Sequence, residues 1–186
     1  MDWKNIISIT ISLIALIFSI YQYFGEYRRA KNKDTLEEIY QLQNDVFDNL
    51  NYLRDNYPDL RECYPEKNSE PTIDKRERKQ ITNYLAKLDR FCAGVDVKVY
   101  SMKMVKSFKG EFFVRIYIYL RPVIVSKRIR RFNTQKEKQE ERYHKFEKVA
   151  RKLNNKYNYD LGDEELKRRL KNNNFSDELI EYVVGC

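Results

Sequence analysis

An uncharged apolar run close to the N-terminus constrains the fold of this chain more than any other feature. Residues Ile6 to Phe24 contain no charged side chain, and a strongly charged stretch follows them. About 20 helical residues cross the hydrocarbon core of a bilayer. A helix also satisfies its own backbone hydrogen bonds, as lipid requires. The run therefore predicts a transmembrane anchor over residues 1–25.

The charges that flank the run predict its orientation. Lys4 is the only basic residue before the run, and Asp2 offsets it. Four basic residues follow the run, namely Arg28, Arg29, Lys31 and Lys33. Because basic flanks stay on the cytoplasmic side, we expect the N-terminus outside and the remainder of the chain in the cytoplasm.

The same run could instead be a cleaved secretory signal. A signal has a shorter apolar region, of about 7 to 15 residues, and small residues at its cleavage site. Here the aromatic residues Tyr21, Tyr23 and Phe24 close the run, and no Ala-x-Ala pattern follows. Trp3, Tyr21 and Tyr23 are placed as interfacial anchors at its two ends. The sequence favours an uncleaved anchor.

One face of the predicted anchor carries small residues. Ser8, Ser12, Ala15 and Ser19 recur at helical spacing, with Gln22 next in register. Small residues allow two helices to approach closely in lipid, so this stripe is a candidate for self-association into a homo-oligomer. Alternatively, each serine hydroxyl bonds the carbonyl of its preceding turn and is simply tolerated.

The remainder of the chain has the composition of a packed domain. Roughly 160 residues follow the anchor, the size of one ordinary domain. Aromatic residues make up 14% of the chain, which argues against disorder. Cys63, Cys92 and Cys186 form no CxxC pair and leave an odd count, which fits a reducing compartment.

Two amphipathic helices are predicted first in this domain. Asp34 is placed to cap a helix from Thr35 to Tyr57, and residues 58–74 read as a loop. A second helix is expected over Lys75–Ala93, with Gly94 placed to end it.

Residues 95–120 support two interpretations. Valines alternate with polar residues over 95–99, and Phe112–Leu120 is rich in β-branched and aromatic residues, which is typical of two strands around Lys109-Gly110. The helical alternative places a short helix over Ser101–Phe108, capped by Ser101 and ended by Gly110, and another helix up to Pro122. Periodicity alone leaves both open.

The last third of the chain is predicted to be helical and strongly basic at its start. A basic helical stretch is expected over Ile124–Phe132, a helix over Gln135–Leu153, and two short helices over Asp160–Lys171 and Ser176–Val184, the last capped by Ser176. Residues 126–152 hold eleven basic and four acidic residues, and so most of the chain's net charge of +8.

This basic segment is the best candidate for binding an anion. The candidate phosphate contacts are Lys127, Arg128, Arg130, Arg131 and Lys138. Phe132 and Tyr143 lie among them and could stack on bases, although the spacing matches no known nucleic-acid motif. A basic helix is more often a solvated face. Contact with anionic lipid headgroups comes next, because the anchor holds the segment near a membrane.

Catalytic patterns are poorly represented. His144 is the only histidine, and neither cysteine nor serine pairs with it at a recognisable spacing. Four zinc ligands are not grouped, and no glycine belongs to a phosphate-binding loop. We therefore expect no enzyme, no metal site and no cofactor.

Several segments together resemble a known family. They are Tyr84–Val95, Phe112–Tyr117, Leu120–Ile124, Arg128 and Tyr143–Ala150, in this order after the anchor. The pattern resembles a bacterial family of short, membrane-anchored helical proteins that is described only as a domain of unknown function. It covers about residues 3–153, and Asp89 stands where the family is expected to have Glu. The resemblance implies helices across residues 95–120.

With the resemblance included, we predict an all-α fold: one transmembrane helix followed by a cytoplasmic helical bundle. The predicted divisions are 1–25 for the anchor, 26–153 for the helical domain and 154–186 for a C-terminal pair of short helices. The alternative fold is α+β, with a β-hairpin around residues 95–120.

The functional expectation is a membrane-anchored protein that acts by binding a partner or by self-assembly. The alternative is a membrane-tethered sensor of a nucleotide or nucleic acid, as in bacterial antiphage systems, that uses the basic segment. A membrane-bound enzyme is the third possibility.

Overall fold

Helices form all the regular structure that is described here. The computed structural model describes residues 3–58, 60, 74–134 and 143–184, and these ranges contain no strand. The elements are α1 (Trp3–Leu42), the π-helical turn η1 (Gln43–Phe47), α2 (Asp48–Asn56), α3 (Lys75–Asp96), α4 (Met102–Phe108), α5 (Gly110–Thr134), α6 (His144–Tyr157), α7 (Asp163–Asn172) and α8 (Asp177–Val184). The all-α prediction is confirmed.

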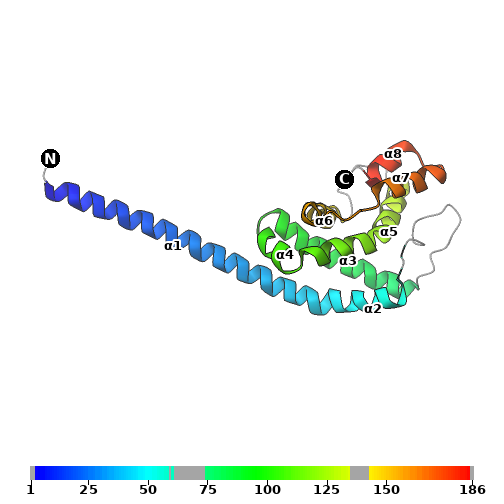
Figure 1. Ribbon diagram of the computed structural model, residues 1–186, viewed down its shortest axis with the longest axis horizontal. Coiled ribbons are helices and arrows are strands. Elements are labelled where there is room, and N and C mark those ends of the chain that lie inside the picture. The colour runs from blue at the N-terminus through cyan, green and yellow to red at the C-terminus, as the bar shows by residue number, and fades with distance from the viewer. Residues whose placement is uncertain (1–2, 59, 61–73, 135–142, 185–186) are drawn as a thin grey trace.

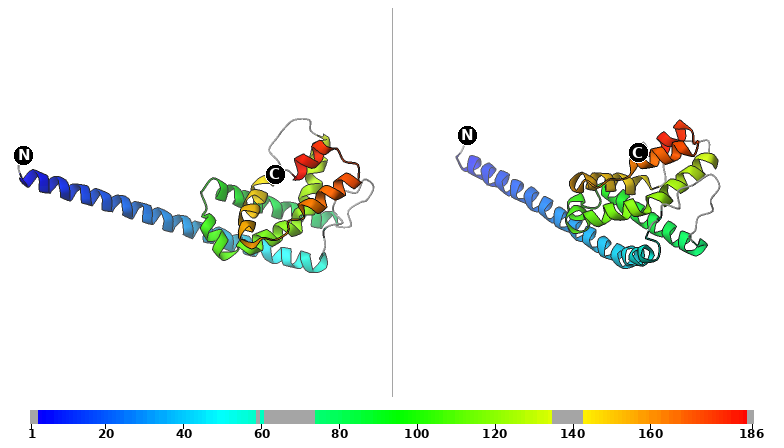
Figure 2. Two further views of the ribbon diagram at one scale, coloured as in Figure 1. Left: turned by 45° about the horizontal axis from the view of Figure 1, so that its top comes forward. Right: turned by 45° about the vertical axis from the view of Figure 1, so that its right-hand side comes forward.

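The first three elements form one rod. Helical structure runs without interruption from α1 through η1 into α2, and the N–H of Asp48 donates to the carbonyl of Gln43, five residues back. The first part of the rod projects alone, whereas the second part lies along the bundle (Figure 1). Two other views show the same projection (Figure 2).

The bundle has an aromatic centre. The ring of Phe113 on α5 lies 5.6 Å from that of Phe47, 5.6 Å from that of Phe91 and 6.5 Å from that of Phe146. These residues come from four different elements, and all are buried. Because one ring contacts partners from the rod, α3 and α6, it unites the layers of the bundle.

Helix α5 crosses the middle of the bundle and has buried residues on most of its faces. Phe113, Val114, Tyr117 and Leu120 are all at most 1% exposed. This is why its sequence lacks a clear helical stripe and also fits strands. The alternative hairpin over residues 95–120 is wrong: α4 and α5 occupy that stretch. Pro122 lies inside α5, so the expected end of the helix there is also wrong.

The C-terminal pair packs on the far part of α5. Val125 and Ile129 of α5 form a second apolar cluster with residues of α7 and α8, namely Leu166, Leu170, Leu179, Ile180, Val183 and Val184. At the start of α8 the N–H of Leu179 donates to Ser176 Oγ (3.3 Å), as the predicted cap requires. Residues after Tyr157 therefore have their own small core but share α5 with the bundle.

Helix boundaries differ from the prediction near the anchor. No helix begins at Thr35, because α1 is already helical there. Thr35 is buried and its hydroxyl is used in a tertiary contact. The predicted division at residue 25 therefore falls within a continuous helix.

Two other boundaries are corrected by packing. Gly94 does not end α3, which continues to Asp96. A Cβ at Gly94 would lie 2.5 Å from Tyr100 Cδ2, so the glycine makes room for a ring that stacks on Phe91. Gly110 does not end α4 but begins α5.

The predicted helix over Gln135–Leu153 is described only in part. Residues 135–142 lie outside the described ranges, and α6 begins at His144 after Tyr143, whose φ is 63°. The predicted apolar face of α6 is buried, including Phe146, Val149 and Leu153.

Candidate functional site

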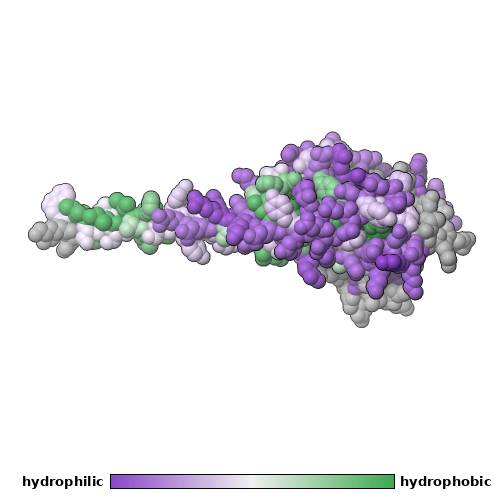
Figure 3. Space-filling view, turned by 90° about the horizontal axis from the view of Figure 1, so that it is seen from below, coloured by the Kyte–Doolittle hydropathy of each residue, from purple (hydrophilic) through white to green (hydrophobic). Residues whose placement is uncertain are grey.

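The projecting part of α1 is apolar on all sides. Its large apolar side chains from Ile6 to Phe24 are 38–78% exposed. Figure 3 shows apolar surface along this part of the rod and hydrophilic surface where the rod nears the bundle. A helix that exposes such a surface all round is suited to lipid rather than to water. The described chain thus has one helix long and apolar enough to span a membrane.

The small-residue stripe lies on this exposed part of α1. Ser8, Ser12, Ala15 and Ser19 are all exposed. The hydroxyl of Ser12 donates to Ser8 O (2.9 Å), and that of Ser19 donates to Ala15 O (2.9 Å). The hydroxyls of Ser12 and Ser19 therefore already have hydrogen-bond acceptors within the helix. A second helix would pack closely against the small side chains of the stripe rather than bond to these hydroxyls.

A polar joint, formed by Lys31 and Thr35 a few residues after the apolar run, fixes the rod to the bundle. Lys31 Nζ donates to the carbonyl of Lys98, which lies in the turn between α3 and α4. One helical turn later, Thr35 Oγ1 accepts a hydrogen bond from Ser101 N (2.8 Å). Ser101 therefore starts α4 with its N–H held by α1, and its side chain makes no capping hydrogen bond.

Next to this joint, three lysines of α6 gather around one carboxylate. Lys145, Lys148 and Lys152 lie 3.2, 2.7 and 3.9 Å from the carboxylate of Asp96. Hydrogen bonds from Lys148 and Lys145 lower the pKa of Asp96 to about 2. One negative charge thus faces three positive charges, and this lysine cluster keeps a positive excess at the end of α3.

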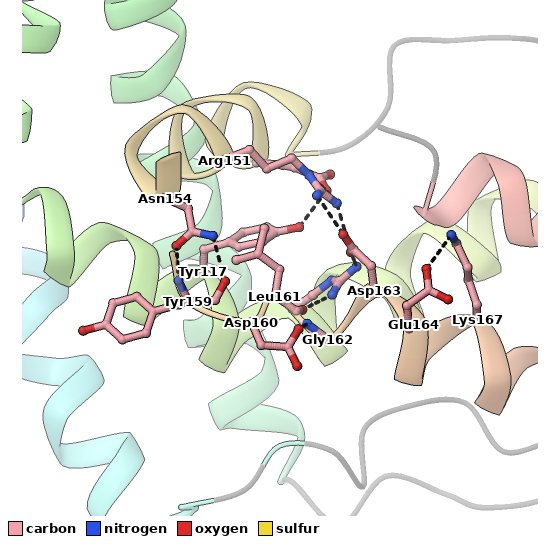
Figure 4. A network of polar contacts seen from close by, with 12 residues as sticks. Tyr117, Arg151, Asn154, Tyr159, Asp160, Leu161, Gly162, Asp163, Glu164 and Lys167 are labelled. Atoms are coloured by element: carbon pink, nitrogen blue, oxygen red, sulfur yellow. Dashed lines mark hydrogen bonds and ion pairs between the residues drawn. The ribbon is translucent and has the colours of Figure 1, made fainter. Parts of the chain in front are cut away.

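A buried ionic network holds α5, α6 and α7 together. Arg128 and Glu147 are each 2% exposed and approach to 2.7 Å. Glu147 also accepts from the hydroxyl of Tyr117 (2.6 Å) and from Arg151 Nε (3.0 Å). Arg151 Nη1 also donates to Asp163 Oδ2 at the start of α7 (3.0 Å), as Figure 4 shows.

The carboxylates of this network stay ionised. Burial alone would raise the pKa of Glu147, but Arg128, Tyr117 and Arg151 together lower it. The same holds for Asp163, whose pKa Arg151 and Arg121 lower against the effect of burial. The network therefore consists of charged groups that pair inside the fold.

The predicted anion contacts are only partly brought together. Lys127, Arg128, Arg130 and Arg131 lie on the last turns of α5, whereas Lys138 lies outside the described residues. Arg128 is turned inward to Glu147. The predicted stacking rings are also used in packing: Phe132 lies 5.4 Å from Tyr182, and Tyr143 is 7% exposed.

The sequence gives little indication of which carboxylates pair with the lysine cluster and with the arginines of the buried network. Asp96, Glu147 and Asp163 are far in the chain from most of the residues they bind, so only the fold brings them together. The spacing of Glu147 and Arg151 at i and i+4 was the one local cue to the network.

Two shallow depressions of about 400 Å³ lie on the bundle. One is lined at the α4–α5 corner by Lys106, Lys109, Arg115 and Tyr157, and the other lies beside Tyr119, Arg121 and Leu161. In the first, Arg115 is already paired with Glu111 (2.7 Å). Within the described ranges, no group of His, Cys, Asp and Glu is arranged to hold a metal ion.

The single described free cysteine is inert in this setting. Cys92 is fully buried on α3, and burial raises the pKa of its thiol well above the ordinary value. A thiol of this kind packs as a small apolar side chain.

Comparison with known proteins gives a family and no activity. The profile of the domain of unknown function DUF4760 matches residues 9–153, from within the apolar run to the core of α6. No curated protein and no solved structure matches. The match covers the rod from Ile9 onward, the joint and the bundle up to Leu153 in α6, and it leaves α7 and α8 outside. The chain is therefore a member of the DUF4760 family, as its motifs predicted.

Proposed function

We propose that this protein is a single-pass membrane protein that acts by binding, with its helical bundle held close to the cytoplasmic face of a bacterial inner membrane. The observation that supports this most is the unbroken rod from Ile6 to Asn56. Its first part is exposed and apolar, and its second part contributes Ile39, Leu42 and Phe47 to the core. One element thus serves both as anchor and as a structural part of the bundle.

The proposed orientation has the N-terminus outside. Arg28 and Arg29 lie in α1 directly after the apolar run, where the positive-inside rule places cytoplasmic residues. Cysteines introduced by Asp2→Cys and Lys171→Cys, in a chain without its native cysteines, test this in intact cells. A membrane-impermeant thiol reagent should label position 2 only. Labelling of position 171 instead would reverse the orientation.

The proposed mode of binding is self-association through Ser8, Ser12, Ala15 and Ser19. A stripe of small side chains lets two backbones approach closely and pack well in lipid, where apolar burial alone does not drive helix pairing. Leucine at Ser8, Ser12 and Ser19 would fill this space on both partners.

Crosslinking in native membranes tests the stripe. The triple change Ser8→Leu, Ser12→Leu and Ser19→Leu should abolish a crosslinked dimer that the unchanged chain forms, while membrane insertion is retained. Thr10→Leu is the matched control, because Thr10 also bonds the preceding turn (Ile6 O, 2.8 Å) but lies on the opposite face. If all forms crosslink equally, the stripe plays no part.

The nucleotide-sensing alternative has less support. Arg128 is buried and paired, and the rings of Phe132 and Tyr143 are used in packing. We therefore favour assembly at the membrane over recognition of a nucleic acid by α5.

A further inference from the structure

We propose that the turn between α3 and α4 is a second membrane contact, which docks onto the anionic headgroups of the leaflet through Val97, Lys98 and Val99. We name these three residues the docking turn. The inference rests on the proposed function, because the apolar run of α1 must be inserted for the turn to meet lipid. It adds a contact by which the bundle itself, and not only its anchor, is oriented on the membrane.

The position of the docking turn along the rod places it at the lipid surface. Its carbonyl at Lys98 is bonded by Lys31, only seven residues after Phe24 at the end of the apolar run. At 1.5 Å per residue, this is a rise of about 10 Å. The headgroup layer of each leaflet is about 5 to 8 Å deep, and charges act over about 8 Å beyond it at physiological salt.

The docking turn also has the side chains that a headgroup layer accepts. Val97 is 68% exposed and Val99 is 59% exposed. Neither side chain belongs to the core, so packing does not require an apolar residue at either position. Lys98 stands between them, so the turn offers two apolar side chains around one positive charge. Such a combination suits an interface in which acyl chains and acidic headgroups meet.

The backbone of the docking turn is unusual for the residue it carries. Lys98 has φ of 65°, a left-handed conformation that glycine adopts far more readily. A lysine is thus kept where glycine would suit the backbone better. Strain of this kind is more often found at functional positions than elsewhere.

Charge around the docking turn complements an anionic leaflet. Directly before the turn, Asp96 is surrounded by Lys145, Lys148 and Lys152, which leaves a positive excess. On the rod, Arg28 and Arg29 are exposed between the apolar run and the joint. The basic residues of the rod stand nearer the apolar run than most of its acidic ones: Arg28, Arg29, Lys31 and Lys33 lie before Asp34, Glu37 and Glu38, and only Glu26 precedes them. Glu38 lies next to Tyr100, on the bundle side of the docking turn. In contrast, the basic end of α5 lies at the end of the bundle away from the N-terminus of α1 (Figures 1 and 2).

Fluorescence quenching by lipids tests the inference on the full chain in nanodiscs. Discs of phosphatidylcholine alone are compared with discs that also contain phosphatidylglycerol, each with a headgroup-labelled quencher lipid. A fluorophore is attached at one cysteine per sample, introduced by Val97→Cys, Tyr52→Cys or Leu16→Cys in a chain without native cysteines. Tyr52 is 67% exposed on α2, far from the docking turn, and Leu16 lies in the apolar run.

We expect quenching of the fluorophore at position 97 to increase when phosphatidylglycerol is present and to fall at high salt. The fluorophore at position 52 should be quenched in neither disc. Lys98→Glu should remove the increase in quenching at position 97 that phosphatidylglycerol causes, whereas Lys171→Glu on α7 should leave that increase unchanged. Lys98→Gly should also reduce quenching while preserving the melting temperature, because glycine fits the left-handed backbone.

The position 16 fluorophore separates the two ways of failing. If it shows insertion and position 97 is quenched no more than position 52, the docking turn is not a lipid contact and the proposed anchor stands. If position 16 shows no insertion, the proposed function fails, and the docking inference fails with it.

Discussion

At the scale of single residues, Asp89 ties α3 to the start of α6. The N–H of Phe146 donates to Asp89 Oδ1 (2.9 Å), and the preceding Tyr143 makes no side-chain cap of its own. The carboxylate therefore caps a helix that follows more than fifty residues later in the chain. This gives a physical role to the position where the family resemblance led us to expect Glu.

Removing this cap should destabilise the bundle modestly. Loss of an N-terminal cap costs about 0.5 to 2 kcal/mol, so Asp89→Ala should lower the free energy of unfolding by about 1 kcal/mol. Asp89→Asn keeps an acceptor and should cost less. Chemical unfolding in detergent, followed by circular dichroism, measures both. Equal stability of Asp89→Ala and the unchanged chain would contradict the capping role.

Arg128 should matter more to stability than any exposed arginine. Its removal leaves Glu147 as a buried charge with weaker compensation, which typically costs about 3 to 5 kcal/mol. We expect Arg128→Met to approach this range in the same unfolding assay. The control is Arg115→Met, whose ion pair with Glu111 is exposed and should contribute at most about 1 kcal/mol. Similar losses for both variants would mean that burial of the Arg128–Glu147 pair has little effect.

At the scale of elements, local sequence predicted helices better than their junctions. Residues Asp34 to Glu38 have the pattern of a helix start, yet they lie inside α1, which begins at Trp3 and continues to Leu42. Nothing local distinguishes a capping aspartate from an exposed one, because the difference depends on whether the preceding residues are also helical. The packing of Thr35 against the start of α4 is a tertiary contact that no local pattern encodes.

In the central helix α5, local sequence does not even determine the type of secondary structure. Residues Phe112–Leu120 fit strands because aromatic and β-branched residues suit both a sheet and a fully surrounded helix. Only the family resemblance favours the helix over the strands, and the structure confirms the helix. Likewise, basic residues 127–131 were visible in the sequence, but the inward turn of Arg128 depends on Glu147 of another helix.

Gly25 lies in α1 at the point where the anchor and the bundle part of the rod meet. A Cβ there would contact nothing within 4 Å, so Gly25→Ala is sterically free. Alanine should strengthen the helix locally by about 0.5 to 1 kcal/mol. Hydrogen exchange of the amides around this position should slow in the Gly25→Ala chain. Faster exchange would indicate that the rod is not helical at Gly25 in the membrane.

At the scale of the whole molecule, the stability of the fold should depend on pH because Asp96 titrates. Its pKa in the folded chain is about 2. This pKa lies below the ordinary value of about 3.9 for an aspartate. The ion pairs of Asp96 therefore contribute their full stabilisation at any pH above about 3.9. The stabilisation should be lost as the pH falls from about 4 toward 2.

Thermal unfolding across this pH range checks the assignment. The melting temperature of the unchanged chain should fall more steeply with acid than that of Asp96→Asn. Asp163 also has a lowered pKa, so both chains should lose some stability. Parallel curves for the two chains would show that the lysine cluster does not bind Asp96 in solution.

The central claim is that one continuous helix carries the bundle at a fixed place on the membrane. Spin labels introduced by Ile14→Cys and Asp34→Cys, in a chain without its three native cysteines, lie on either side of Gly25 and twenty residues apart. In lipid nanodiscs, pulsed electron paramagnetic resonance should find a single narrow distribution, with the two backbone positions about 30 Å apart. A broad distribution, or a clearly shorter distance, would show a hinge between anchor and bundle and would contradict the account.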